Sequence, residues 1–342
     1  MISIVTAGLF TTVQDGGRWG FQAYGMPVAG AMDRYAYNIA NILAGNPPGA
    51  ACLEMTVTGD TIKFATDTYI AICGADMRPT LDGRPVDTWS AFPVAAGSTL
   101  ACGYAVRGCR TYLAVSGGID VPVVLGSRST YTRAAVGGLE GRKLKIGDTL
   151  AIGRSDTADN RPLLLPDAYR PAGAGDEITL RVLPGPQDDH FTAAGLATLF
   201  ASTYTVTDEA DRMGYRLEGP KIEHGGKADI VSDALPQGAI QVPGHGMPII
   251  MMADRQTTGG YTKIGTVIGP DLALLAQAKP GDTIRLSQCS DEEAVDAFGR
   301  ERALYEAAAA WRASALGREQ YPPRRFTLTV NGQNYSIEIR EE

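Results

Sequence analysis

The chain has 342 residues, of which 44% are hydrophobic, and it carries a formal net charge of −7. This length suggests about two domains, since domains usually contain roughly 100–200 residues. The negative charge argues against nucleic acid or an anionic membrane as a partner, and no apolar run approaches the ~20 residues of a membrane span. The five cysteines show no CxxC spacing, and the N-terminus has no signal-peptide pattern, so we expect a cytoplasmic protein. Three histidines argue against a His-rich metal centre, and no metal is predicted.

Residues 1–153 form the first predicted domain, in which short strand patterns alternate with glycine-rich turns. Asp33 is predicted to cap a helix, because apolar residues then recur every three or four positions until Gly45. The rest of this half has too few helical patterns for a wound α/β sheet, so a mainly β domain is expected.

Residues 154–177 differ in character, with three prolines, many small residues and no period, and we interpret them as a linker. A second strand-rich domain follows at 178–289, with a short helix expected at 192–200. Each half ends in a Lys-x-Gly-Asp-Thr sequence, at Lys145 and at Lys279, which indicates a divergent duplication or a chance similarity of two turns. We therefore predict two β-barrel domains that meet near residues 154–177.

The C-terminal segment, residues 290–342, is predicted to hold a helix and a hairpin. Ser290 and Glu293 have the spacing of a capping box, and Gly317 is the expected end of the helix. Two alternating patterns at 326–330 and 335–339 flank Asn331-Gly332, the strongest short hairpin signal.

A polar turn after a buried strand is the most conspicuous candidate for a site. The apolar run at 249–253 predicts the strand, and it is followed by the sequence DRQTTGGY. Such turns commonly build sites, but a hydrogen-bonded barrel corner is the competing interpretation. The candidate catalytic residues in this turn are Asp254, Arg255, Gln256, Thr257 and Tyr261.

Two arginines four positions apart, Arg212 and Arg216, are a second candidate. Together they could bind a carboxylate through paired hydrogen bonds. The alternative is a surface ion pair, which contributes little. His245, between two glycines, is interpreted as a solvent-facing loop residue without a catalytic role.

Several motifs for nucleotide and cofactor chemistry are absent from the sequence. There is no Walker A loop, no GxSxG, no HExxH, no GxGxxG after a strand, and no Met-Lys-Met biotinylation site. If ATP or biotin is used, we expect another chain to supply the machinery.

Seven blocks of sequence resemble the allophanate hydrolase subunit 2 family. Among them are GLFTTVQDGGRWGF and DRMGYRLEG. The blocks lie at residues 8–33, 74–76, 110–130, 137–148, 181–191, 211–219 and 238–261. Members of this family include KipA and the C-type subunit of 5-oxoprolinase, and the carboxyltransferase region of urea carboxylase is similar. The resemblance implies a fold of two tandem cyclophilin-like β-barrels.

The same resemblance implies a place in a multi-subunit enzyme. The expected activity is that of an ATP-dependent 5-oxoprolinase, or of a related biotin-dependent amide carboxyltransferase acting on a cyclic amide or urea-like substrate. A KipI-like (subunit 1) protein is the expected partner, with a LamB/YcsF-type subunit or a biotin carrier and biotin carboxylase as further partners. ATP and, in carboxyl-transferring relatives, carboxybiotin would come through these partners. The alternative is a non-catalytic KipA-like regulator that binds and antagonises a KipI-like kinase inhibitor.

Site roles follow as hypotheses. Asp254 would accept a substrate N–H or act as base, and Arg212 or Arg216 would hold a carboxylate, while the other residues of the polar turn line the pocket. Gln241 is a further candidate for substrate binding, and Gln14, Asp15 and Arg18 are candidates that would face a partner or a second pocket. The tail at 326–342 resembles the segment before a biotin carrier domain, and it is either an ordinary hairpin or a docking strand.

Overall fold

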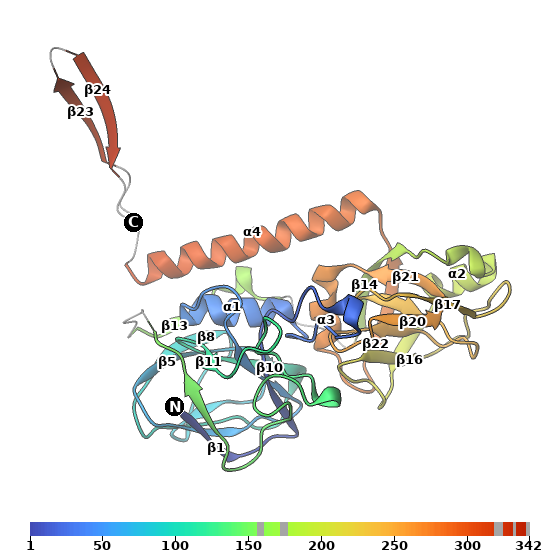
Figure 1. Cartoon of the computed structure of the whole chain (residues 1–342), viewed down its shortest axis with the longest axis horizontal. Coiled ribbons are helices and arrows are strands. Elements are labelled where there is room, and N and C mark those ends of the chain that lie inside the picture. Colours follow the sequence, from blue (N-terminus) through green and yellow to red (C-terminus); the bar gives the residue numbers. More distant parts are fainter. Residues whose placement is uncertain (156–160, 172–176, 318–323, 331–332, 340–342) are drawn as a thin grey trace.

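The computed structural model describes residues 1–155, 161–171 and 177–317, together with the backbone of two strands at 324–330 and 333–339. Two β-rich units lie side by side, and one long helix, α4, runs across both (Figure 1). The prediction of a mainly β chain with two consecutive β units is confirmed. No helix in these described ranges is long and apolar enough to cross a membrane.

The N-terminal unit is built from two sheets that share one apolar core. One sheet has the order β11-β12-β1-β4-β9-β6-β7 and the other β13-β8-β5-β10-β3-β2. Ile4 and Phe64 from the first sheet pack with Leu53 and Ile72 from the second. The strands are β1 (Ile2–Thr6), β2 (Phe10–Gln14), β3 (Cys52–Thr56), β4 (Thr61–Phe64), β5 (Thr68–Asp76), β6 (Thr80–Leu81), β7 (Arg84–Pro85), β8 (Ser90–Val94), β9 (Thr99–Ala101), β10 (Arg107–Val115), β11 (Ile119–Asp120), β12 (Thr149–Ile152) and β13 (Leu163–Leu164).

Helix α1 (Arg34–Ala44) covers the outer face of the six-stranded sheet. As predicted, Asp33 is its N-cap, and the Asp33 carboxylate accepts a 2.9 Å hydrogen bond from the backbone N–H of Ala36. The buried stripe of α1 includes Ile39 and Leu43, so the predicted spacing indicates the face that packs on the sheet.

The predicted linker contains structure of its own. Strand β13 pairs with β8 through Leu163 and Ala91, and Leu165 is fully buried. Two leucines of the apolar run at 163–165 explain this attachment, because Leu163 and Leu165 are buried and apolar side chains are more stable out of water, whereas Leu164 is exposed. Residues 156–160 and 172–176 of the predicted linker lie outside the described part of the chain.

The C-terminal unit is a closed barrel with the order β14-β21-β18-β19-β16-β15-β22. Its first and last strands pair in parallel, from Glu177 opposite Thr283 to Val182 opposite Gln288, and this pairing closes the barrel. The barrel strands are β14 (Glu177–Pro184), β15 (Thr203–Val206), β16 (Gly214–Glu218), β18 (Ala239–Gln241), β19 (Ile249–Met251), β21 (Lys263–Val267) and β22 (Thr283–Gln288). A separate two-stranded sheet joins β17 (Asp229–Ala234) to β20 (Thr258–Tyr261).

Two short helices accompany the barrel, α2 (Ala193–Ala201) and α3 (Leu272–Ala276). Helix α2 begins after Thr192, whose hydroxyl accepts from Gly195 N–H, in agreement with the predicted helix at 192–200. Helix α3 follows the short 3-10 turn η5 (Gly269–Asp271) and lies at the boundary between the two units.

Helix α4 (Asp291–Ala315) begins with the predicted capping box, in which the Ser290 hydroxyl accepts from Glu293 N–H and the Glu293 carboxylate accepts from Ser290 N–H. It packs against α1, with Ala308 buried and Trp311 partly buried in the same core cluster. Strands β23 (Arg324–Val330) and β24 (Gln333–Ile339) pair antiparallel, as the hairpin prediction requires. The predicted turn residues Asn331 and Gly332 lie outside the described residues.

Candidate functional site

The predicted catalytic turn begins in the buried interior, at Asp254 and Arg255, and ends at the surface, at Tyr261. Strand β19 ends at Met251, two residues before the predicted end, so Asp254 and Arg255 lie in the turn and are buried. Gln256 and Thr257 are half-buried, whereas Tyr261 is 41% exposed and lies opposite Asp229 in the β17–β20 sheet.

Arg212 and Asp254 form a two-pronged buried ion pair. The Arg212 Nε lies 3.0 Å from Asp254 Oδ2, and Nη2 lies 2.9 Å from Oδ1. Arg212 Nη2 also donates to the Gly30 carbonyl at 2.7 Å, and Nη1 donates to the Glu54 carboxylate. The guanidinium is thus bound to protein groups in this structure, and the role of Arg212 in holding a substrate carboxylate stays a prediction.

Glu54, on β3, is the centre of this buried network and is 0% exposed. Besides Arg212, it accepts from Tyr112 Oη at 2.7 Å and from Met32 N–H at 2.9 Å, and Arg110 Nε lies 4.0 Å from Oε1. Two acids and two arginines therefore balance one another across the boundary between the units. Burial raises the pKa of the Asp254 carboxyl above its ordinary value, and the Arg212 charge opposes that shift.

Arg216 is separate from this centre. Its side chain is exposed and pairs with Glu209 at 2.9 Å. The surface ion-pair alternative therefore describes Arg216, and the two arginines do not form a joint carboxylate clamp. Arg212 precedes the start of β16 at Gly214, so its direction is set by the turn and its buried partners.

Arg255 binds the backbone on either side of its turn. Its Nε donates to the Leu235 carbonyl at 2.9 Å, and Nη1 donates to the Met252 carbonyl at 3.2 Å. Burial, together with the nearby positive charge of Arg34, lowers the pKa of Arg255 to about 10. These bonds are those of a barrel corner, which was the competing interpretation of this turn.

Gln14, Asp15 and Arg18 are all buried and all bind the neighbouring segment at 124–130. Gln14 Nε2 donates to the Thr130 carbonyl at 3.1 Å, and the Ser129 hydroxyl donates to Asp15. Arg18 Nη2 donates to the Ser129 carbonyl at 2.9 Å. The structure therefore buries these three side chains against this segment, and their role in facing a partner or a second pocket stays a prediction.

Gln241 and Gln256 each keep one polar atom without a partner among the described residues. Gln241 Nε2 and Gln256 Oε1 are both buried and unbonded. Gln241 lies in β18 and contacts the β20 backbone at Gly259, next to the turn that holds Gln256. Their predicted binding roles remain predictions.

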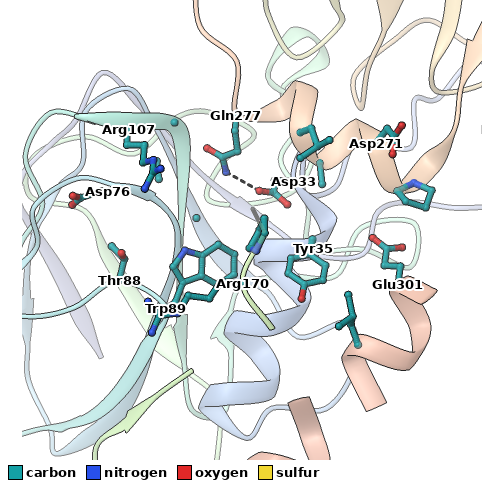
Figure 2. Close-up of a pocket in the computed structure, with 18 of the residues that line it drawn as sticks. Asp33, Tyr35, Asp76, Thr88, Trp89, Arg107, Arg170, Asp271, Gln277 and Glu301 are labelled. Carbon is teal, nitrogen blue, oxygen red and sulfur yellow. Dashed lines mark hydrogen bonds between the residues drawn. The ribbon is translucent and has the colours of Figure 1, made fainter. Parts of the chain in front are cut away.

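A cavity of about 590 Å³ lies between the two units, beneath α4 (Figure 2). None of the predicted site residues lines it. Its walls come from the start of α1, from β5 and β10, from α3 and from α4. The polar and aromatic lining residues are Asp33, Tyr35, Asp76, Thr88, Trp89, Arg107, Arg170, Arg181, Asp271, Gln277, Arg300 and Glu301.

Gln277 joins the two units at this cavity. Its Nε2 donates to Asp33 Oδ2 at 2.7 Å and to the Arg110 carbonyl at 2.9 Å. Its Oε1 accepts from the backbone N–H groups of Cys109 and Arg110 at 2.9 and 3.0 Å. Burial raises the pKa of Asp33 to about 6, although the hydrogen bonds from Gln277 and Ala36 oppose the shift.

Trp89 forms an aromatic wall of the cavity together with Tyr35, with ring centroids 6.2 Å apart. Trp89 has a φ of 59°, an unfavourable conformation for a bulky side chain. Hydrogen bonds on both sides hold it there, from Trp89 N–H to the Ile72 carbonyl at 2.7 Å and from Leu165 N–H to the Trp89 carbonyl at 2.9 Å. Backbone strain of this kind is concentrated at functional sites.

The four arginines of the cavity differ in what they bind. Arg181 pairs with Asp271 at 2.6 Å, and Arg170 donates to the Leu165 carbonyl at 2.8 Å. Arg107 and Arg300 are exposed, and through their side chains they make no hydrogen bond or ion pair with any residue that the structure describes. These two guanidinium groups are available to an anionic ligand.

Comparison with known proteins assigns the chain to a family. Residues 24–288 match the carboxyltransferase domain, subdomains A and B. The chain belongs to this family. It is 41% identical over 312 residues to the C-type subunit of 5-oxoprolinase from Escherichia coli (strain K12), an alignment that covers 91% of this chain and 98% of that protein. It is 38% identical over 294 residues to the corresponding 5-oxoprolinase subunit of Haemophilus influenzae, covering 86% of this chain and 93% of that protein.

Longer relatives of this carboxyltransferase-family chain include urea amidolyases and urea carboxylase. The urea amidolyase of Saccharomyces cerevisiae is 34% identical over 85% of the chain, which spans only 17% of that protein. The crystal structure of Kluyveromyces lactis urea amidolyase is similar to this chain with a TM-score of 0.85 and 30% identity. The match covers 90% of this chain and 20% of the urea amidolyase chain. The crystal structure of Kluyveromyces lactis urea carboxylase is similar with a TM-score of 0.86 and 27% identity. That match covers 99% of this chain and 32% of the urea carboxylase chain. The resemblance to the C-type 5-oxoprolinase subunit and to the carboxyltransferase region is confirmed.

Sequence reasoning missed the residues that line the cavity of this carboxyltransferase-family member. Asp33 was identified only as a helix cap, and Arg107, Trp89 and Gln277 were not singled out. No local pattern marks them, because they are far apart in the sequence and Gln277 joins the other three only when the two units are in contact. Among the described residues, no group of three or more His, Cys, Asp or Glu side chains is placed to hold a metal ion.

Proposed function

We propose that this chain is the C-type subunit of a multi-subunit enzyme of the 5-oxoprolinase class, which opens a cyclic amide at the expense of ATP. The observation that carries the proposal is the near end-to-end similarity to the C-type subunit of Escherichia coli, since 98% of that protein is covered. The urea amidolyase and urea carboxylase matches cover a fifth to a third of those proteins, so they support a shared domain more than a shared overall reaction.

The remaining functions of the enzyme would belong to partner subunits. A KipI-like protein is the first partner in this proposal, and a LamB/YcsF-type subunit is the second. ATP would be supplied through these partners, as would carboxybiotin if the substrate is carboxylated. The comparison with urea amidolyase supports such a division, because the region similar to this chain is only 17% of that longer protein.

The chain's own contribution would be to bind and orient the amide. The cavity between the units offers the guanidinium of Arg107, which no described residue binds, an aromatic wall at Trp89 and a buried carboxylate at Asp33. This set fits a small carboxylated amide, because an arginine binds a carboxylate with directed hydrogen bonds and a carboxylate accepts an N–H. Holding the reacting groups in one geometry lowers the barrier by reducing the entropy lost at the transition state.

Reconstitution tests the proposal. The chain should be purified alone and co-purified with its KipI-like and LamB/YcsF-type partners, and each preparation assayed for ATP hydrolysis and for conversion of 5-oxoproline to glutamate. We expect both activities only in the assembled complex. Robust turnover by the isolated chain, tracking with it through chromatography, would contradict the proposal. A complex that forms but opens no amide, and instead changes kinase inhibition, would favour the regulatory alternative.

A further inference from the structure

We infer that the cavity between the two units is the amide-binding site, in which Arg107 binds the carboxylate of a small carboxylated cyclic amide and Asp33 accepts its N–H. The identity of the ligand rests on the proposed function, whereas the assignment of the site rests on the contacts of the cavity residues. Figure 2 shows Gln277 between Arg107 and Asp33 in this view, with the ring of Trp89 below them.

Arg107 is one of the two arginines of the cavity lining, with Arg300, whose side chains have no hydrogen-bond or ion-pair partner among the described residues. It is the first residue of β10, and its backbone pairs with Asp76 of β5. The pairing register then shifts before Thr111, and irregularities of this kind redirect side chains beside active sites. Arg181 and Arg170, in contrast, are bound to protein groups, as described above. A carboxylate entering the cavity therefore meets Arg107 without displacing an existing partner.

A glycine lets Gln277 pack closely against the β10 backbone next to Arg107. Gly108 has a φ of 74°, and a Cβ atom there would lie 2.7 Å from Gln277 Oε1 and 3.1 Å from the Ala75 side chain. Any side chain at this position would therefore press on the amide that orients Asp33. The close approach that Gly108 permits is that of Gln277, whose amide donates to Asp33 from this position.

Asp33 is prepared to accept one more donor. Each of its two oxygens already accepts one hydrogen bond, Oδ1 from Ala36 N–H and Oδ2 from Gln277 Nε2. A carboxylate has about four acceptor positions, so both oxygens retain capacity. The carboxylate is held rigidly by these donors, and the backbone N–H of Asp33 itself donates to Tyr112 Oη at 2.7 Å. It is therefore a fixed acceptor for the N–H of a lactam.

The charges of the cavity select a ligand with an anionic end and a donor end. Arg107 and Arg300 are cations whose side chains have no partner in the described part of the chain, while Asp33 and Glu301 are acidic groups of the same lining. The indole of Trp89 supplies a flat apolar surface in the same lining. A cavity of 590 Å³ lies within the usual range for small-molecule sites, about 300–1,000 Å³, and is larger than a single small lactam. The remaining volume leaves room for a second reactant to approach from a partner subunit.

Direct binding to the isolated chain tests the site without requiring turnover. Calorimetric titrations should compare 5-oxoproline with 2-pyrrolidinone, which is the same lactam without the carboxylate. We expect wild type to bind 5-oxoproline about 10- to 100-fold more tightly, as for loss of a charge-assisted hydrogen bond. The variant Arg107→Gln should lose this preference and bind the two lactams with similar affinity. Arg216→Gln, which removes an exposed arginine paired with Glu209, is the matched control and should retain the wild-type preference.

Two results would overturn the assignment. One is wild-type chain that does not bind 5-oxoproline or binds both lactams equally. The other is an Arg107→Gln variant that keeps the preference. Steady-state assays of the assembled complex separate this inference from the proposed function. Binding at the cavity with no turnover by the complex would reject the function and keep the site, whereas turnover of 5-oxoproline with an unchanged KM in Arg107→Gln would reject the site and keep the function.

Discussion

Replacing Arg212 with methionine tests whether the buried ionic centre stabilises the contact between the two units. In the wild type, Arg212 donates four hydrogen bonds, two to Asp254 and one each to Glu54 and the Gly30 carbonyl. The variant leaves Glu54, which is 0% exposed, with Arg110 as its nearest remaining cation at 4.0 Å. Removing one partner of a buried pair typically costs about 3–5 kcal/mol. At an unfolding entropy of about 2.1 cal/mol/K per residue over 342 residues, the melting temperature should fall by roughly 4–7 °C.

Arg216→Met is the control for this experiment, because Arg216 lies four residues away and its ion pair with Glu209 is exposed. An exposed pair contributes about 0–1 kcal/mol, so its melting temperature should fall by about 1 °C or less. Both variants should be melted on the same day by circular dichroism and tryptophan fluorescence, and the two probes should coincide.

The fall in melting temperature of Arg212→Met relative to wild type should itself depend on pH, and this provides a second readout. Without Arg212, burial should raise the pKa of Asp254 further, since burial already raises it in the wild type and Arg212 opposes that shift. A carboxyl whose pKa is higher in the folded than in the unfolded state binds more protons when folded, so it gains stability as the pH falls. The deficit of Arg212→Met should therefore be smaller at about pH 5 than at about pH 8. A melting temperature within a degree of that of Arg216→Met, at both pH values, would refute the structural role given to Arg212.

Three further outcomes are expected. Arg255→Ala should lower the free energy of unfolding by about 1.5–3 kcal/mol, because it removes charged hydrogen bonds to the Leu235 and Met252 carbonyls; an unchanged melting curve would contradict this. Burial raises the pKa of Asp33 from 3.8 to about 6, so this residue contributes stability that is present below pH 3.8 and lost as the pH rises through 6. Asp33→Asn should therefore make the melting temperature depend less on pH between these values. A dependence as steep as that of wild type would exclude the raised pKa. Tyr261→Phe should leave melting unchanged because the ring is 41% exposed, so that any fall in kcat/KM of the complex reports on the predicted catalytic turn alone.

The sequence predicted secondary structure well where an element depends on interactions between residues that are close in the sequence. The caps of α1 and α4 at Asp33 and Ser290 depend on donors within three residues, and both are observed. The alternating strand patterns likewise indicated two β units. They did not indicate that the first unit would consist of two sheets while the second closes as a barrel, because closure depends on pairing between distant strands such as β14 and β22.

The candidate site was much less predictable, because its contacts join residues far apart in the sequence. The sequence predicts that Arg212 binds a substrate carboxylate, but its partner Glu54 lies 158 residues earlier and no local pattern joins the two residues. Gln277 and Asp33 are separated by 244 residues, and neither belongs to a recognisable motif at that distance. Charged residues near one another in sequence, such as Arg212 and Arg216, are therefore poor guides when one of them is directed into an interface.

The division of the ionic centre between the two units has a consequence for synthesis of the chain. Glu54 and Arg110 leave the ribosome before Arg212 and Asp254 are made, and domains generally fold as units, N-terminal first. Until the barrel is complete, Glu54 and Arg110 of the nascent N-terminal unit are exposed to water. The backbone N–H groups of Cys109 and Arg110, which Gln277 will bind, are exposed as well. A finished barrel from another copy offers the same partners, so incomplete chains should be especially prone to domain swapping during rapid expression.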